Sequence, residues 1–240
     1  MNTNINIAIA TDVSAELTPM SSLRKTSLTA GILYLLTFVS IPTLTLYSSI
    51  RGANYVVGAG PDTAVFIGCI LEIIVALAGI GTAVALYPVL KKQNEGIALG
   101  LVASRVLEAC TIFVGVAFLL SIVTLRQAGA GTNALVTSHA LVSLYDRIFL
   151  IGQSFIPAVN GLLLGSLLYQ SRLVPRVLPL IGLAGAVLLV AGDIAVLFGL
   201  IEQHAPSTAL VAIPIALWEF SLGIYLVVKG FQPSPITAGM

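Results

Sequence analysis

Six long apolar segments constrain the fold of this chain more than any other feature. They cover residues 27–47, 63–90, 96–125, 146–169, 177–200 and 210–228. A helix needs about 20 apolar residues to cross the roughly 30 Å of hydrocarbon in a bilayer, and each segment is long enough or nearly so. Backbone polar groups inside lipid must be bonded within the segment, so each is expected to be helical. The sequence therefore predicts an all-α, polytopic membrane protein, a bundle of six transmembrane helices.

The composition agrees with a chain surrounded mainly by lipid. Of 240 residues, 58% are hydrophobic and 9% are charged, whereas soluble domains carry about 25% charged residues. The net charge is +1, and the basic residues are scattered rather than gathered in a stripe for nucleic acid. We therefore expect the lipid bilayer as the main partner and no nucleic-acid binding.

The expected domain organisation is a six-helix transmembrane domain over residues 23–230 between two tails. Residues 1–22 are polar and have no basic residue before an apolar core, so they are expected to be a disordered cytoplasmic tail rather than a signal peptide. Residues 231–240 are expected to form the C-terminal tail. Pro42 is expected to kink the first helix. Residues 127–145 are rich in Gly, Thr and Ser and are expected to form a loop.

Basic residues near the ends of the spans predict the orientation. Seven lie on one side of the membrane: Arg24, Lys25, Lys91, Lys92, Arg172, Arg176 and Lys229. Three lie on the other side: Arg51, Arg126 and Arg147. Because cytoplasmic loops carry an excess of Lys and Arg, both termini are expected in the cytoplasm, with the protein in the inner or plasma membrane.

Polar side chains inside the predicted spans are the candidate site residues. The ionisable ones are Glu72, Arg105, Glu108, Asp193 and Glu219, and the fourth span adds Asp146, Arg147, Gln153 and Asn160. A charge in the middle of a bilayer costs roughly 2.5–3.5 kcal/mol, so each charged group should face the bundle interior. The intramembrane acids lie on helical stripes of small or polar residues, which suits close helix contact.

Arg105 and Glu108 are three residues apart, on one helix face, and can pair with each other or across the bundle. At 1.5 Å rise per residue they lie roughly 13–18 Å from the cytoplasmic end of their span, near the midplane, and Glu219 is expected at similar depth. The outer half is expected to hold Glu72 and Asp193, closer to the outer end of the fourth span.

Four carboxylates inside the spans face the single guanidinium of Arg105. At least some of them are therefore expected to be protonated or hydrogen-bonded as neutral acids. This cluster predicts a small-ligand or proton-linked transporter or sensor with a polar intramembrane site. The alternative is a structural or assembly protein in which the same buried charges fix helix packing.

Catalytic and metal-binding motifs are incomplete in the sequence. His139 and His204 are the only histidines and lie in predicted outer loops, so no metal site or cofactor is expected. Cys69 and Cys110 lie in apolar segments without CxxC spacing and are expected to be small core residues.

Fragments of one catalytic signature are present. Tyr145-Asp146, Ala191-Gly192-Asp193 and residues 214–217 look like the YD, GxGD and PAL motifs of intramembrane aspartyl proteases. Val190 replaces the first glycine, and an isoleucine interrupts the last motif. We expect no enzyme activity, and proteolysis stays an alternative that requires the two aspartates to lie in near contact.

Glycines recur at spacings that suit helix packing. The fifth span contains Gly182, Gly185, Gly192 and Gly199, and GxxxG matches occur at residues 96–100 and 161–165. They are expected to mark close helix contacts, within the bundle or in a homo-oligomer.

Several segments resemble a bacterial six-helix membrane family catalogued as domain of unknown function 4386. They are Arg24-Lys25 before residues 30–35, Leu86-Tyr87-Pro88, Arg105 with Glu108-Ala109, and residues 173–178. The resemblance runs from about residue 24 to residue 230. It implies a membrane fold and no particular activity, and it makes Arg105, Glu108 and Glu219 look like family features.

Overall fold

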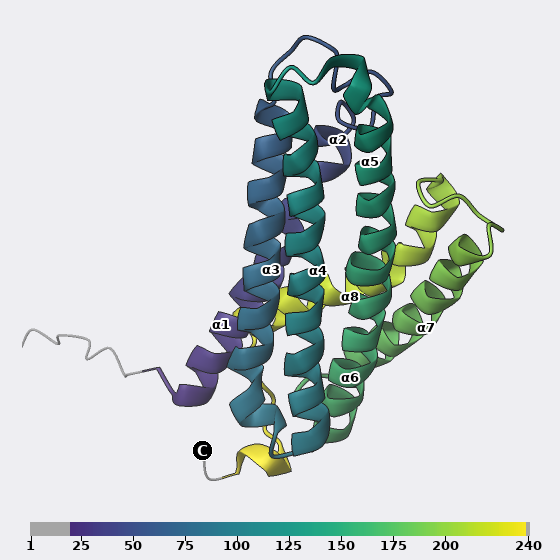
Figure 1. Cartoon of the computed structure of the whole chain (residues 1–240). Helices are drawn as coiled ribbons and strands as arrows, with labels where there is room; N and C mark the ends of the chain where they lie inside the picture. The colour runs from purple at the N-terminus through teal and green to yellow at the C-terminus, as the bar shows by residue number, and fades with distance from the viewer. Residues whose placement is uncertain (1–19, 239–240) are drawn as a thin grey trace, which may run out of the picture.

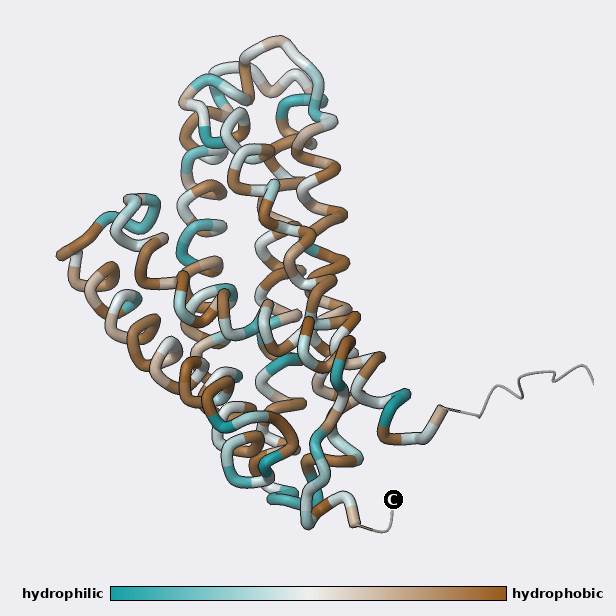
Figure 2. The backbone as a smooth tube through the Cα atoms, turned by 180° about the vertical axis from the view of Figure 1, so that it is seen from behind, coloured by the Kyte–Doolittle hydropathy of each residue, from teal (hydrophilic) through white to brown (hydrophobic). Residues whose placement is uncertain are grey.

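The computed structural model describes residues 20–238, which are helical with short connections and contain no strand. Six stretches are long and apolar enough to span a membrane: Ser22–Leu46, Thr63–Leu90, Glu95–Gln127, Gly131–Ser171, Val177–Leu197 and Pro206–Val228. The predicted fold class and number of spans are confirmed. Hydrophobic residues line most of each helix, as contact with lipid requires (Figure 2). Most of the expected N-terminal tail, residues 1–19, lies outside the described residues.

Eight α-helices build the chain over this range: α1 Ser22–Leu36, α2 Thr43–Leu46, α3 Thr63–Leu90, α4 Glu95–Gln127, α5 Leu135–Phe149, α6 Ile156–Ser171, α7 Val177–Leu197 and α8 Pro206–Val228. Short 3-10 helices cover Thr37–Ser40, Gly131–Ala134 and Pro235–Thr237. A π-helical segment, Leu150–Phe155, joins α5 to α6.

The first span is interrupted where the sequence predicts a kink. Regular α-helix ends at Leu36, continues as a 3-10 turn, and begins again after Pro42, which has no N–H to donate. The hydroxyls of Thr37 and Thr43 donate to backbone carbonyl groups three residues earlier, at 2.7 Å each. Such side-chain bonds compete with the helical ladder and help to bend the span.

The fourth span differs from the prediction. The composition of residues 127–145 predicts a loop, but from Gly131 onward they are helical, and the span continues without a break to Ser171. The reason is that α5 packs on α4 and buries Tyr145 between its neighbours. Burial of that face outweighs the weak helix propensity of Gly, Thr and Ser.

The six spans form a closed ring. α1 packs on α3, α3 on α4, α4 on α6, α6 on α7, α7 on α8, and α8 returns to α1. α5 extends the fourth span along α4, and Figure 1 shows α3, α4 and α5 as a tall group from which α7 and α8 diverge toward the top. The interior of this ring is the place where buried polar groups from several helices can meet.

The two ends of the bundle differ in charge. One end holds the start of α1, the α3–α4 and α6–α7 turns, and the end of α8 (Figure 1). We call it the basic end, because seven Lys and Arg residues lie there: Arg24, Lys25, Lys91, Lys92, Arg172, Arg176 and Lys229. The opposite end, here the loop end, carries the connection of residues 47–62 and the α4–α5 and α7–α8 connections.

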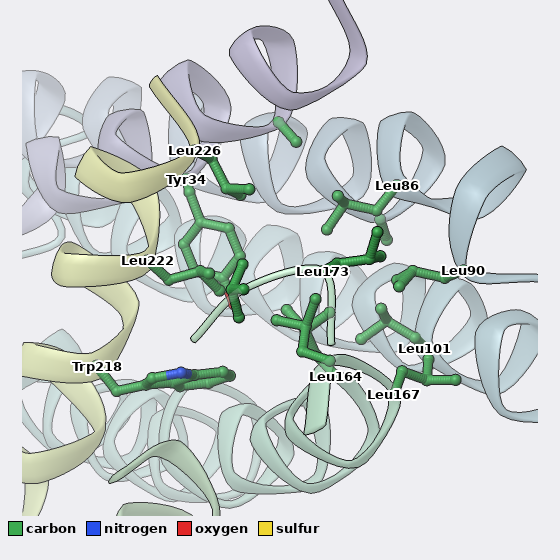
Figure 3. Close-up of a cluster of buried hydrophobic side chains, with 14 of the residues drawn as sticks. Tyr34, Leu86, Leu90, Leu101, Leu164, Leu167, Leu173, Trp218, Leu222 and Leu226 are labelled. Atoms are coloured by element: carbon green, nitrogen blue, oxygen red, sulfur yellow. The ribbon is translucent and has the colours of Figure 1, made fainter. Parts of the chain in front are cut away.

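Apolar side chains fill the ring in two clusters. Toward the basic end, Tyr34 and Trp218 point into the same interior among leucines such as Leu164 and Leu222 (Figure 3). Toward the loop end, a second cluster is built around Tyr145. Cys69 is buried in that second cluster, whereas Cys110 is exposed on α4, so its prediction as a core residue is wrong.

Glycines set the contact between α7 and α8. A Cβ atom on Gly185 would lie 2.7 Å from the backbone nitrogen of Ile215, and one on Gly182 would lie 2.3 Å from the Trp218 ring. Gly192 approaches Val211 in the same way. Side chains at these positions would force the two helices apart, so α7 and α8 form a tightly packed hairpin.

The structure agrees with some of the other glycine predictions and not with others. Gly161 packs against Ile215 of α8 and Ala186 of α7, and Gly165 packs against Leu183 of α7, as close helix contact requires. Among residues 20–238, a Cβ atom on Gly100 would meet nothing within 4 Å, and one on Gly96 would meet only Asn94 of its own N-cap, so residues 96–100 mark no close helix contact within the bundle. Gly199 has φ +70 just after α7 and ends that helix instead of packing.

Candidate functional site

Arg105 of α4 is the centre of a buried polar cluster inside the ring. Its Nη1 donates to Glu108 Oε2 at 3.0 Å, and its Nη2 donates to Glu219 Oε1 at 3.3 Å and to the Tyr34 hydroxyl oxygen at 3.1 Å. The Tyr34 hydroxyl in turn donates to Glu219 Oε1 at 3.4 Å. Arg105 is only 6% exposed. The guanidinium therefore joins side chains of α1, α4 and α8.

Two further helices complete this cluster. From α6, Asn160 Nδ2 donates to Glu108 Oε2 at 2.7 Å. From α3, Gly79 borders the arginine, since a Cβ atom there would be in ordinary contact with Arg105 Cδ at 3.8 Å. We call Tyr34, Arg105, Glu108, Asn160 and Glu219 the Arg105 cluster. Because five spans converge on it, a change in its charge or hydrogen bonding would be felt across most of the bundle.

The charge balance of the Arg105 cluster is uneven. One guanidinium faces two carboxylates, and a single positive charge neutralises only one of them. The second must be compensated, because an unbalanced charge inside the membrane is costly. A proton or a bound cation would balance it. The arrangement is therefore able to exchange a proton, or a cationic ligand, without losing its arginine bridge.

Two buried polar atoms, one in the Arg105 cluster and one on the residue that precedes Glu219, have unused hydrogen-bonding capacity. Asn160 Oδ1 and Trp218 Nε1 have no hydrogen-bond partner among residues 20–238. Trp218 precedes Glu219 on α8, and its side chain is fully buried. The Asn160 oxygen lies within the Arg105 cluster and is an acceptor of the kind that a small polar ligand uses.

Glu72 of α3 belongs to a second cluster, nearer the loop end. The Tyr145 hydroxyl donates to Glu72 Oε1 at 2.6 Å, and Gln153 also approaches this carboxyl. Tyr47 packs edge-on against the Tyr145 ring, and Arg51 lies over that ring at 5.5 Å. Glu72 and Asp146 are therefore linked through Tyr145 and Arg51, near the loop end.

Asp146 lies at the loop end of the bundle, where three elements meet. Its carboxylate pairs with Arg51 at 3.1 Å and with His204 Nε2 at 3.3 Å, and its backbone oxygen accepts from Gln203 Nε2 at 2.7 Å. Asp146 thus ties the α7–α8 connection to α5. Arg147 is exposed and forms no ion pair or hydrogen bond through its side chain within the described range, so the structure leaves it apart from the other candidates.

Asp193 stands apart from the other candidates. Its Oδ1 accepts from the Ser154 hydroxyl at 2.6 Å, and its side chain is 2% exposed. Asp146 and Asp193 have different partners, so no contact between described residues supports a shared aspartyl dyad. The nine candidate residues therefore divide into the Arg105 cluster, the Glu72 and Asp146 network, the separate Asp193, and the exposed Arg147.

Sequence reasoning misses Tyr34 and Arg126. Tyr34 lies in an apolar run where an aromatic residue has no distinctive signal. The sequence treats Arg126 only as an outer charge, but it donates to Gly58 and Gly60 carbonyl oxygens at 3.1 and 2.7 Å and to Asp62 at 2.6 Å. It thereby fixes the connection between the first two spans, a role that spacing along the chain cannot reveal.

Burial and hydrogen bonding shift the pKa of two titratable groups in that connection. Burial raises the pKa of Tyr55 to about 12, helped by its bond to Asp62. Burial alone would raise the pKa of Asp62, but hydrogen bonds from Tyr55, Gln127 and Arg126 and the charge of Arg126 hold that pKa below its ordinary value. Asp62 is therefore the charged acceptor around which the connection is organised.

The fold and the buried polar groups define a multi-span membrane protein. Residues 29–230 match the family model described as Domain of unknown function (DUF4386). Since this match covers most of the chain, the protein belongs to that family, as the resemblance predicts. No curated protein and no solved structure matches the chain.

Proposed function

We propose that the Arg105 cluster is a proton-linked site for a small ligand, and that the protein works as a transporter or sensor built on it. One observation carries the proposal. A single buried guanidinium bridges carboxylates from two different helices, Glu108 of α4 and Glu219 of α8. Buried ionisable groups inside a membrane are costly, and they usually mark proton relays or ligand pathways.

In this proposal, protonation of Glu219 links the charge of the Arg105 cluster to the position of α8. When ionised, Glu219 holds α8 to Arg105 through a charge-assisted hydrogen bond, which is stronger than a neutral one. When Glu219 is protonated, its charge attraction to Arg105 is lost, and the ion pair between Arg105 and Glu108 remains. Because glycine contacts bind α7 to α8, the two helices would respond together. The moving element in this proposal is therefore the α7–α8 hairpin.

The contacts at the loop end support the same hairpin as the responsive part. Gln203 and His204 of the α7–α8 connection bond to Asp146 on α5. The hairpin packs on α1 and α6, and polar contacts at the loop end and at Glu219 also join it to the bundle. A change in these polar contacts would shift the hairpin against α1 and α6 by the small sliding that packed helices allow.

For the orientation, we propose that the basic end faces the cytoplasm of an inner or plasma membrane. The excess of Lys and Arg at that end supports this, because positive charge is retained on the cytoplasmic side. Both termini would then be cytoplasmic, and the Asp146 network would face outward. A cysteine-accessibility assay at Glu202→Cys, in the C69S/C110S background, would test it. Labelling from outside intact cells supports the proposal, and labelling only after lysis contradicts it.

A structural role is the second candidate, since an arginine bridging two carboxylates also holds helices together. Glycine contacts would serve the same role, within the bundle or between copies of the chain. The two candidates differ in one respect. A packing role requires the ion pairs to be constant, whereas a proton-linked role requires their occupancy to change with pH.

Trp218 provides the test, because it is the only tryptophan in the chain and adjoins Glu219. We expect its fluorescence in reconstituted vesicles to change with pH in one transition that Glu219→Gln abolishes. Glu202→Gln, the same change at an exposed position, serves as the control and should titrate like the wild type. Fluorescence independent of pH in the wild type, with Glu219→Gln lowering only stability, would favour the structural role.

A further inference from the structure

A pocket of about 250 Å³ lies at the basic end, apart from the clusters described above. Ser21 and Arg24 at the start of α1 form one wall, and Lys229 with the segment that follows α8 forms the other. Figure 1 shows the start of α1 and the C-terminal segment at the same end of the bundle. Ser21 and Lys229 are exposed, so polar groups of the pocket can be reached from the surface.

The C-terminal wall of the pocket is fixed by its own hydrogen bonds. Gly230 ends α8 with φ +77, a backbone conformation that favours glycine. Beyond it, the backbone N–H of Gln232 donates to Leu173 O at 2.8 Å, and the Ser234 hydroxyl donates to Ser171 O. The segment therefore packs against the α6–α7 turn, and the pocket is a fixed part of the fold.

Arg24 is held at this pocket without an anionic partner. Its Nη1 donates to Leu226 O at 3.0 Å and its Nη2 to Val227 O at 2.5 Å, both in the last turn of α8. These bonds use two of the five N–H groups of the guanidinium. Carbonyl oxygens carry no net charge, whereas carboxylates neutralise Arg105 and Arg126. Arg24 is therefore fixed in position with its positive charge uncompensated by the residues it bonds.

Lys229 brings a second positive charge to the pocket. Among residues 20–238, no ion pair includes Arg24 or Lys229, and no acidic residue lines the pocket. Ser21, Gln232 and Thr237 add hydroxyl and amide groups to the lining. Two cations with such neighbours suit an anion, and the planar guanidinium matches the oxygen atoms of a phosphate group.

The pocket lies at the depth where the headgroups of a bilayer would be. Val228, the residue before Lys229, is 62% exposed, and Ile224 one turn earlier is 42% exposed. Exposed apolar side chains on a membrane-spanning helix contact acyl chains. The hydrocarbon therefore ends close to Val228, and Lys229 is level with the lipid phosphates. The volume is just below the roughly 300–1,000 Å³ that encloses a drug-sized ligand, which suits a headgroup rather than a whole lipid.

We propose that this pocket binds an anionic phosphate ester, with its phosphate oxygens bonded by Arg24 and Lys229 and the hydroxyl groups of its alcohol part by Gln232 and Thr237. Basic pockets at the surface of a membrane attract anionic headgroups in this way. The bound anion would join the first and last spans of the ring at the basic end. The site is separate from the Arg105 cluster, and the proposal does not depend on the function proposed above.

Two sources share this chemistry. One is the headgroup of an anionic membrane lipid, and the other is a soluble phosphate ester. We would measure binding to the delipidated full-length protein by native mass spectrometry, with phosphatidylglycerol, phosphatidylcholine and glycerol phosphate as probes. Phosphatidylcholine with the same acyl chains also has a phosphate, but its quaternary ammonium group cancels the charge, so it is the matched control for the anionic lipid.

We expect the wild type to bind phosphatidylglycerol about tenfold more tightly than phosphatidylcholine, which corresponds to about 1.4 kcal/mol. Lys229→Gln should remove most of this preference. Arg24→Gln should do the same, and Lys229→Gln keeps the test valid if loss of the bonds from Arg24 to α8 prevents folding. Lys92→Gln makes the same charge change at an exposed position of the α3–α4 turn, at the same end of the bundle, and should bind like the wild type.

Gln232→Trp tests the pocket itself, because it fills the cavity without changing the charge of the basic end. We expect it to lower the binding of phosphatidylglycerol to the level of phosphatidylcholine. If it binds phosphatidylglycerol as tightly as the wild type does, the anion does not occupy the pocket and the proposal is overturned.

The remaining outcomes are equally definite. If glycerol phosphate binds in a manner that depends on Lys229 while the two lipids bind alike, the occupant is a soluble phosphate ester and the chemistry proposed for the pocket stands. If the wild type neither prefers phosphatidylglycerol nor binds glycerol phosphate, the proposal is overturned. It is also overturned if Lys229→Gln and Lys92→Gln weaken anion binding equally, because the attraction would then come from the general charge of the basic end.

Discussion

Replacement of Gly182 by alanine tests the packing that positions Glu219. The added Cβ atom would lie 2.3 Å from two carbons of the buried Trp218 ring, whereas carbon atoms in ordinary contact are about 3.5–4.0 Å apart. Either the ring or α7 must move by more than about 1 Å. Overpacking of this kind costs about 1–3 kcal/mol. We expect Gly182→Ala to lower the free energy of unfolding by that amount and to alter Trp218 fluorescence.

Gly100→Ala is the matched control, because the space around that helical glycine is open to 4 Å. Alanine is the better helix former by about 0.5–1 kcal/mol, so this variant should be as stable as the wild type or more so. Unfolding in mixed micelles, followed by circular dichroism, compares the three proteins. Equal stability of Gly182→Ala and the wild type would refute the close packing of α7 on α8.

Two further predictions concern the connection at the loop end. Arg126→Ala removes the bonds to Gly58, Gly60 and Asp62. Proteolytic cleavage between residues 52 and 62 should therefore become roughly tenfold faster, equivalent to about 1.4 kcal/mol of lost local stability. Arg126→Lys should recover only part of the protection against cleavage. Because the pKa of Asp62 is held below its ordinary value in the folded protein, its stabilising effect is present above the ordinary aspartate pKa and is lost as the pH falls through the lowered value. Asp62→Asn should remove that acid sensitivity, and a cleavage rate in the wild type that does not change on acidification would contradict this assignment.

The spans and the centre of the site were predictable because both follow from the cost of polar groups in lipid. The length of the apolar runs predicts the helices, and the same cost requires Arg105, Glu108 and Glu219 to point inward. The structure brings these three together. The helix spacing of Asn160 likewise predicts an inward face, where it bonds to Glu108.

Other features depend on contacts that spacing along the chain does not encode. The helical character of α5 arises from packing on α4, against its local composition. The Tyr34 hydroxyl and the bonds of Arg126 depend on which helices are neighbours in the ring. Cys110 lies on an exposed face of α4, although its apolar surroundings in sequence resemble those of the buried Cys69.

Whether the Arg105 cluster exchanges a proton can be measured most directly by infrared difference spectroscopy of the reconstituted protein, recorded between alkaline and acidic buffers. We predict that one component of the C=O stretching band that appears on acidification is missing in Glu219→Gln or Glu108→Gln and persists in Glu72→Gln, Asp193→Asn and Glu202→Gln. A band that is the same in the wild type and in both cluster variants would contradict a proton-linked site and leave the arginine bridge as a structural contact.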